Sequence, residues 1–245
     1  MDRQPAETDK KRQTYSLRMK LTVMLVYLLI LFCLLLSIEY GVIFNIVFVI
    51  YTGESIDQYH KGNFVKQIEF VKGLSKTFNV SKNDTNVGII TYAGDAAVRY
   101  RFEDITNQTE LENALETLIV ISSGRKMGKA LNEAQTDLFN RSIPDRNDTV
   151  RNILVVIIDG GSDDDIAVPT YALKEDGVTI FSVGIDRYVR GQLNEMASDP
   201  DSDHVFTVDS YDELGSTMAP LKDEIIRGWY RQTLISERTI FQINI

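Results

Sequence analysis

Short apolar runs alternate with amphipathic stretches over residues 41–227, and this alternation predicts an α/β domain. Apolar runs at 41–50, 153–158 and 178–184 predict buried parallel strands, because a strand covered on both faces needs no polar side. Two strands at 87–92 and 97–102 flank Ala93-Gly94-Asp95 and predict a hairpin, with the second strand at an edge of the sheet. A last strand is predicted at 204–208.

Between these strands, apolar positions recur at helical spacing. The pattern predicts helices over residues 61–76, 110–119, 128–139, 166–174, 190–198 and 213–227. Within the first of them, Phe64, Ile68 and Leu74 form a stripe that we interpret as facing the core. The elements together indicate a mainly parallel sheet with one antiparallel edge strand.

A longer apolar segment precedes the domain. Residues 21–38, LTVMLVYLLILFCLLLSI, are 18 residues without a charge, and a membrane span needs roughly 17–25 residues. We predict an uncleaved transmembrane signal-anchor, because a cleaved signal peptide has an apolar region of roughly 7–15 residues and ends at a small-residue site. A cleaved signal peptide and a buried helix are the alternatives.

Charge is distributed unevenly about this segment. Residues 1–20 carry a net charge of +3, which leaves −12 on the rest of the chain. Lys and Arg beside a span are retained in the cytoplasm, so we predict a cytoplasmic segment at 1–20 and an extracellular or lumenal body. The acidic body argues against nucleic-acid binding and favours a basic or neutral partner. The single cysteine, Cys33, permits no intramolecular disulfide.

Five N-x-S/T sequons follow the apolar segment and lie near predicted loops or the ends of predicted elements. They begin at Asn79, Asn83, Asn107, Asn140 and Asn147. We predict N-glycosylation at these asparagines, which agrees with an extracellular body. The domain is expected to span residues 42–227, with a C-terminal tail at 228–245.

Successive blocks of the body resemble a known family. They read NIVFVI (45–50), NFVKQIEFVKGL (63–74), VGIITYAGDAAVRYRF (87–102), GKALNEAQTDLF (128–139), RNILVVIIDGGSDDD (151–165) and GVTIFSVGI (177–185). Over about residues 43–226 the chain resembles von Willebrand factor A domains of the matrilin and collagen type. The resemblance implies a six-stranded doubly wound sheet with helices on both faces and a ligand crevice at the C-terminal ends of the strands.

In that family the crevice holds a divalent cation at a metal ion-dependent adhesion site. The family's site uses a D-x-S-x-S loop, a Thr from a second loop and an Asp after the fourth strand. Here the first loop reads YTGES (51–55), so only Ser55 is kept, and the second loop is one residue short with Lys126 in place of the Thr. Asp159 is intact.

These departures remove most of the oxygen ligands that Mg²⁺ requires. Tyr51 is neutral, Gly53 has no side-chain oxygen, and Lys126 brings a positive charge. We therefore predict no metal cofactor, with Ser55 and Asp159 as the residual ligands if Mg²⁺ did bind. The Asp163-Asp164-Asp165 run is interpreted as a solvated loop.

The resemblance places a ligand-binding crevice at one set of residues: Tyr51, Gly53, Glu54, Ser55, Lys126 and Asp159. We expect Lys126 to act as a tethered cation beside Asp159 or Glu54, with Arg125 as the alternative cation, because a carboxylate in a crevice needs a counter-charge.

Enzymatic activity is not expected, because the sequence has no G-x-S-x-G or H-E-x-x-H motif and no phosphate-binding glycine loop after a strand. The predicted function is a membrane-anchored extracellular module that binds a protein or matrix ligand. The alternatives are a structural ectodomain that forms homo-oligomers, a secreted matrix protein with a cleaved signal peptide, and a fragment of a longer protein.

Overall fold

The computed structural model describes residues 44–58, 60–121, 123–139 and 150–228, together with Lys20 and Met24. The chain divides into two compact units, Met1–Val42 and Ile43–Ile245. The predicted signal-anchor at 21–38 lies outside the described residues except for Met24, as does the tail after Gly228. Among the residues that are described, no helix is long and apolar enough to cross a membrane.

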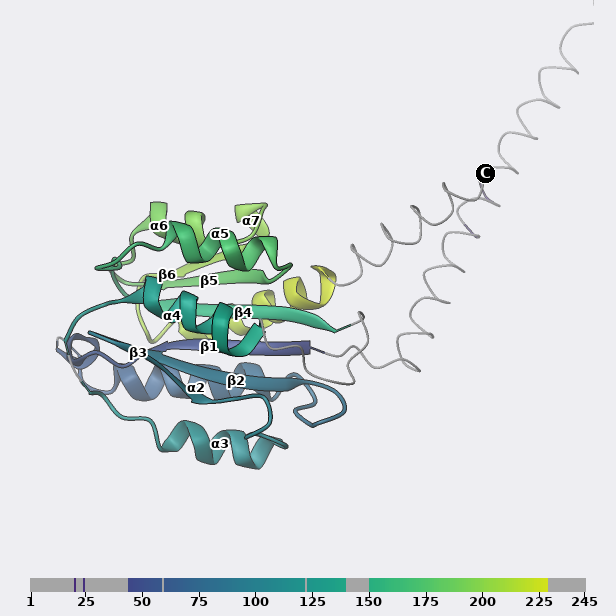
Figure 1. The fold of residues 1–245 in the computed structure, drawn as a ribbon, viewed down its shortest axis with the longest axis horizontal. Helices are drawn as coiled ribbons and strands as arrows, with labels where there is room; N and C mark the ends of the chain where they lie inside the picture. The colour runs from purple at the N-terminus through teal and green to yellow at the C-terminus, as the bar shows by residue number, and fades with distance from the viewer. Residues whose placement is uncertain are drawn as a thin grey trace, which may run out of the picture. The chain divides into compact units, whose positions relative to one another are not determined.

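A six-stranded sheet forms the middle of the second unit (Figure 1). Its strands are β1 (Phe44–Tyr51), β2 (Asn86–Tyr92), β3 (Ala96–Tyr100), β4 (Arg151–Ile158), β5 (Thr179–Ile185) and β6 (Val205–Val208). Their order is β3-β2-β1-β4-β5-β6, and every neighbouring pair is parallel except β2 and β3. The predicted mainly parallel sheet with one antiparallel edge strand is confirmed.

Helices connect the strands. They are η1 (Glu54–Asp57), α2 (Asn63–Ser75), α3 (Gln108–Glu116), α4 (Met127–Glu133), η2 (Ala134–Phe139), α5 (Ala167–Glu175), α6 (Arg190–Met196), α7 (Asp201–His204) and η3 (Leu214–Thr217), and residues 218–228 are also helical. α4 and α5 pack against each other in front of the sheet in Figure 1, whereas α2 lies behind it. Several boundaries differ from the sequence prediction; for example, the helix predicted over 128–139 continues from Ala134 as a π-helix, and α7 includes His204, which was predicted to begin the last strand.

The central strands are buried as their apolar runs predict. All eight residues of β1 and the last six of β4 are buried, because helices cover both faces of the sheet. The predicted stripe of α2 faces the core, with Ile68 and Leu74 buried. This confirms the interpretation of that stripe as packing surface.

A polar feature at the beginning of the strands was not predicted. Asn45, Asn86 and Asn152 occupy paired positions on β1, β2 and β4. Asn86 Nδ2 donates to Asn45 Oδ1 at 3.0 Å, and Asn45 Nδ2 donates to Asn152 Oδ1 at 2.9 Å. Because a buried amide must find hydrogen-bond partners, this ladder favours the observed register of the three strands.

The parallel strands give the sheet two chemically different ends. We call the end where β1, β2, β4 and β5 begin the amino end, and the end where they finish the carboxyl end. The amino end lies on the right in Figure 1 and the carboxyl end on the left. The crevice described below lies at the carboxyl end, whereas the sequons of Asn79, Asn83 and Asn107 lie at the amino end.

Candidate functional site

Two predicted site residues meet at the carboxyl end of the sheet. Tyr51 is the last residue of β1, and Asp159 directly follows its parallel neighbour β4. Both side chains are buried, with Tyr51 1% and Asp159 4% exposed. Ser55 joins them from η1, and its Oγ lies 2.8 Å from Tyr51 Oη.

An arginine guanidinium lies among these three residues. Arg125 Nη2 donates to Ser55 Oγ at 2.8 Å and to Asp159 Oδ1 at 3.2 Å. Arg125 Cζ also lies 4.9 Å from the centroid of the Tyr51 ring, which is within the range of a cation–π contact. Arg125 therefore contacts the hydroxyl, the carboxylate and the ring at once.

Lys126, the first choice for the tethered cation, does not form the expected ion pair. Its side chain is exposed, and within the described residues it makes no ion pair with Asp159 or Glu54. Its backbone N–H donates to Ala93 O at 2.7 Å. The expectation for Lys126 is corrected, and the alternative, Arg125, takes that position.

Backbone hydrogen bonds explain why the loop directs Arg125 inward. Arg125 N donates to Asp163 Oδ2 at 2.6 Å, and Asp163 N donates to Arg125 O at 2.8 Å. The chain at Arg125 is thus held against the loop that follows β4. Sequence spacing alone could not select between two adjacent basic residues.

A tyrosine that sequence reasoning missed completes the surroundings of Asp159. Tyr211, in the loop after β6, is buried and donates from its Oη to Asp159 Oδ2 at 3.1 Å. Both oxygens of the Asp159 carboxylate therefore accept a hydrogen bond. Nothing in the sequence pattern links Tyr211 to a residue 52 positions earlier.

Two glycines make room for the large side chains of the crevice. A Cβ added at Gly53 would lie 2.1 Å from Tyr51 Oη, and one added at Gly160 would lie 2.7 Å from Arg125 Nε. The ring of Tyr51 thus takes the space that a side chain at position 53 would need. Glu54, the remaining predicted crevice residue, begins η1 and is exposed.

The ionisation of these groups follows from their burial and neighbours. Burial raises the pKa of Tyr51, although the Ser55 hydrogen bond and the Arg125 charge oppose this shift. Burial and then the Asp159 charge raise the pKa of Tyr211. Burial alone would lower the pKa of Arg125, but Asp159 and nearby tyrosines raise it overall. The crevice thus pairs one cation and one carboxylate with neutral phenols.

This donor set does not fit a divalent cation. Ser55 Oγ already contacts Tyr51 and Arg125, and both Asp159 oxygens accept hydrogen bonds. Mg²⁺ needs near-octahedral oxygen ligands, whereas a guanidinium offers only donors. In the part of the chain that the structure describes, no group of three or more His, Cys, Asp or Glu side chains is placed to hold a metal.

The acidic run after β4 has a structural role instead of being simply solvated. Asp164 accepts hydrogen bonds from Gly128 N at 2.7 Å and from Lys129 N at 2.9 Å. These N–H groups belong to the first turn of α4, which has no side-chain cap of its own. The interpretation of this run as a solvated loop is therefore wrong for Asp164, which is half-buried, whereas Asp163 and Asp165 are exposed as expected.

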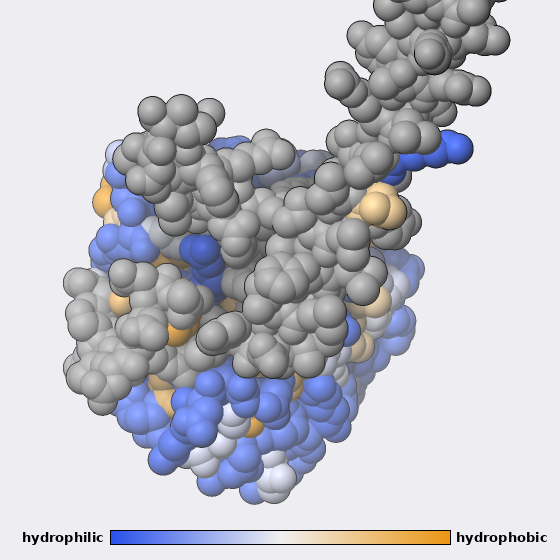
Figure 2. All heavy atoms as spheres, turned by 90° about the vertical axis from the view of Figure 1, so that its right-hand side faces the viewer, coloured by the Kyte–Doolittle hydropathy of each residue, from blue (hydrophilic) through white to orange (hydrophobic). Residues whose placement is uncertain are grey.

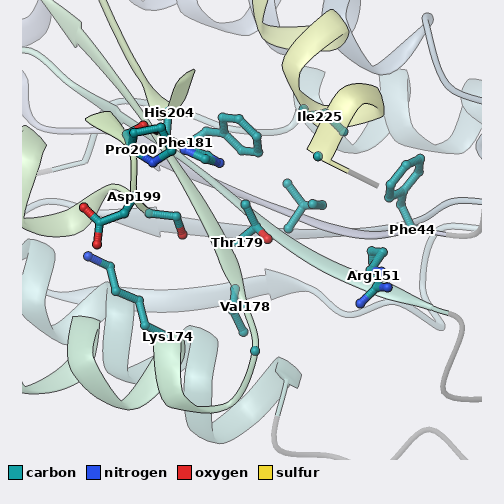
Figure 3. Close-up of a pocket in the computed structure, with 14 residues that line it drawn as sticks. Phe44, Arg151, Lys174, Val178, Thr179, Phe181, Asp199, Pro200, His204 and Ile225 are labelled. Atoms are coloured by element: carbon teal, nitrogen blue, oxygen red, sulfur yellow. Dashed lines mark hydrogen bonds between the residues drawn. The ribbon is translucent and has the colours of Figure 1, made fainter. Parts of the chain in front are cut away.

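A separate pocket of about 460 Å³ lies at the amino end of the sheet. Figure 3 shows Phe44 and Arg151 at one side of it, with Phe181, Pro200 and His204 at the other. Arg151 Nε is buried, and among the described residues it has no hydrogen-bond partner. None of the predicted crevice residues lines this pocket.

The predicted glycosylation sites also lie away from the crevice where they are described. Asn79, Asn83 and Asn107 are exposed. Asn140 and Asn147 lie outside the described residues.

Comparison with known proteins identifies the family. A family model of the von Willebrand factor type A domain matches residues 45–220. Mouse vitrin is 32% identical over 152 residues, which cover 62% of this chain and 23% of vitrin. Cochlin of Cavia porcellus is 30% identical over 194 residues, which cover 79% of this chain and 34% of cochlin. The chain thus spans about a quarter to a third of these relatives.

Solved structures agree in fold. Proximal thread matrix protein 1 from the mussel byssus, in a form with a zinc-occupied MIDAS motif, has a TM-score of 0.68 at 21% identity over 75% of this chain and 46% of that one. A von Willebrand factor type A structure from Catenulispora acidiphila has a TM-score of 0.59 at 15% identity over 74% of this chain and 42% of that one. The chain belongs to the von Willebrand factor type A domain family.

Proposed function

We propose that this chain is an extracellular von Willebrand factor type A domain that binds a protein or matrix ligand without a divalent cation. The observation that carries the proposal is the position of Arg125. Its guanidinium bridges Ser55 and Asp159, the two residues that the family resemblance assigns to the metal. A permanent positive charge therefore stands where the family holds its cation.

The structure gives a physical reason for this arrangement. Asp159 is 4% exposed, and a buried carboxylate without a counter-charge is costly. Arg125 neutralises it and keeps its charge at all physiological pH values. A ligand would then gain affinity from direct contacts around the crevice rather than from coordination to a metal.

The extracellular location rests on sequence and on similarity. All five sequons follow the apolar segment, and one structural relative is named as a matrix protein of the mussel byssus. We propose that this chain likewise acts among extracellular proteins. Catalysis is not part of the proposal.

The proposal has two forms, which differ in the fate of residues 21–38. The segment either anchors the chain in the membrane or is cleaved off as the chain is secreted. The 18-residue uncharged run favours the anchor, whereas similarity to a matrix protein favours secretion. Expression of the full chain in secretory cells separates them. An anchored form stays in the membrane fraction with residues 1–20 intact, whereas a secreted form appears in the medium with a new N-terminus.

Metal independence is tested by thermal unfolding of the full chain in chelator and in millimolar Mg²⁺ or Mn²⁺. A ligand that binds only the folded state raises the unfolding midpoint, so we expect no shift. The matched control is the variant Tyr51→Asp/Gly53→Ser/Arg125→Ala, which restores oxygen ligands and removes the guanidinium. A metal-dependent shift in the unaltered chain would overturn the proposal.

A second candidate function is self-association along edge strand β3. Ile119 and Ile121 are 66% and 44% exposed, and they line a groove of about 340 Å³ with Arg99 and Tyr100 of that strand. An exposed sheet edge beside apolar side chains is a template for pairing. Light scattering after size-exclusion chromatography should show a dimer that Ile119→Glu abolishes, and a monomer at all concentrations rejects this candidate.

A further inference from the structure

Three sequon asparagines that are far apart in the sequence lie close together in the fold. Asn79 and Asn83 belong to the loop between α2 and β2, and Asn107 directly precedes α3. An antiparallel bridge pairs Ser81, the third residue of the first sequon, with Asn107. Two separate sequons are therefore neighbours through their backbones.

The topology places this group at the amino end of the sheet. β1 finishes at the carboxyl end, and α2 returns the chain so that β2 can run parallel to β1. The loop that carries Asn79 and Asn83 therefore precedes β2 at the end where Asn86 pairs with Asn45. Figure 2 faces the amino end, and the described atoms on that face are mainly hydrophilic.

Asn107 uses the two atoms of its amide differently. Its Oδ1 accepts from Glu110 N at 3.0 Å and so caps α3. Its Nδ2 donates a long bond of 3.3 Å to the neighbouring Thr106 Oγ1 and, after the larger effect of Thr106, also helps to lower the pKa of the Glu110 carboxyl. Because N-glycans attach through Nδ2, a glycan on Asn107 leaves the capping oxygen available.

We propose that Asn79, Asn83 and Asn107 carry a cluster of N-glycans at the amino end, which leaves the Arg125 crevice at the carboxyl end uncovered. In each transfer, Nδ2 forms a bond to the anomeric carbon of a polyprenyl-diphosphate-linked oligosaccharide. The bond from that carbon to the diphosphate breaks, the polyprenyl diphosphate leaves, and the amide loses one proton. The inference rests on the proposed extracellular function.

Lysine acetylation of the full chain from secretory cells tests the position of the cluster. Lys82 lies beside Asn83 and Lys126 lies beside the crevice arginine, and both are exposed. Acetylation of each lysine is followed by mass spectrometry before and after enzymatic removal of glycans. Glycan removal should accelerate acetylation of Lys82 several-fold and leave that of Lys126 unchanged.

The results of these measurements distinguish a failure of the glycan cluster from a failure of the proposed extracellular function. A chain without any N-glycan overturns the extracellular location itself. A glycosylated chain in which Lys82 and Lys126 respond alike overturns only the cluster. Glycopeptide analysis shows which of the three asparagines are modified. If Asn79 and Asn83 are modified and Asn107 is not, Asn107 does not belong to the glycan cluster.

Variants of the third sequon test the dual use of Asn107. Thr109→Ala removes the sequon and keeps the cap, Asn107→Asp replaces the cap with another good one, and Asn107→Ala removes both. All three should lose one glycan by mass. Asn107→Ala should melt about 2–4 °C below Asn107→Asp, which also lacks the glycan. Equal melting of these two variants would contradict the capping role.

Discussion

Arg125 and Asp159 form a largely buried ion pair, with an Nη2–Oδ1 distance of 3.2 Å and side chains that are 22% and 4% exposed. The pair joins the loop before α4 to the end of β4 at the carboxyl end of the sheet. A charge supplied by the chain itself cannot be removed by a chelator. Its removal by mutation, however, should leave the carboxylate without its main partner.

Arg125→Ala should destabilise the domain by about 2–3 kcal/mol, below the full cost of breaking a buried pair because Arg125 is partly exposed. Lys126→Ala is the matched control, and its effect should stay within about 0.5 kcal/mol because that side chain is exposed. Urea unfolding measures both. Equal losses for the two variants would mean that the ion pair contributes nothing specific.

Gly53→Ala should destabilise the domain by about 1–3 kcal/mol, because the new Cβ overlaps the Tyr51 ring and forces it to move. The distance from that Cβ to Tyr51 Oη would be 2.1 Å without rearrangement. In the background of Tyr51→Ala the same substitution should cost much less. Additive effects in this double-mutant cycle would argue against the steric explanation.

Asp164→Ala should destabilise the domain by about 1–2 kcal/mol, because it removes the acceptor for two N–H groups in the first turn of α4. Asp165 is the matched control, since its carboxylate accepts one exposed hydrogen bond from Ala167 N. Asp165→Ala should cost less than half as much by urea unfolding. Hydrogen exchange at Gly128 and Lys129 should accelerate only in the Asp164 variant.

Stability should fall above about pH 10, the reference pKa of tyrosine. Burial raises the pKa of Tyr92 well above that of an exposed tyrosine, and burial with the Asp159 charge raises that of Tyr211. A raised pKa in the folded state means that stability is fully present below the unfolded pKa and is lost as the pH rises toward the folded pKa. The loss approaches about 1.4 kcal/mol per pH unit for each such tyrosine.

Urea unfolding between pH 8 and pH 11.5 measures this dependence, with tyrosine ionisation followed by ultraviolet absorbance. Tyr211→Phe is the informative variant. It should lower stability at neutral pH, and the fall in unfolding free energy per pH unit above pH 10 should lose the contribution of one ionising tyrosine. An unchanged slope in that variant would show that Tyr211 ionises as freely in the folded state as in the unfolded one.

The sequence predicted the fold well because its signals are local and repeated. The uniform apolar runs of β1 and β4 and the helical stripe of α2 each identify their own element. The asparagine ladder was missed, because polar residues at the start of an apolar run also suit a loop. Only the register of β1, β2 and β4 brings Asn45, Asn86 and Asn152 together.

The crevice was predictable only in part. Tyr51, Ser55 and Asp159 could be assigned to the crevice because each lies at or soon after the end of a strand that the apolar pattern predicts. The choice between Arg125 and Lys126 depends on hydrogen bonds to Asp163, which come from a loop nearly forty residues later. Tyr211 depends on the path of the chain after β6, which carries no local signal.

The overlap of Tyr51 with the space above Gly53 restricts how this crevice could change over evolutionary time. A serine introduced at position 53 would collide with the phenol ring before it could offer its hydroxyl to a cation. Loss of the tyrosine must therefore come first, and that step alone removes the ring against which Arg125 packs. Each single step toward a metal-binding crevice is thus disfavoured, so the arginine-filled crevice is expected to persist once it has formed.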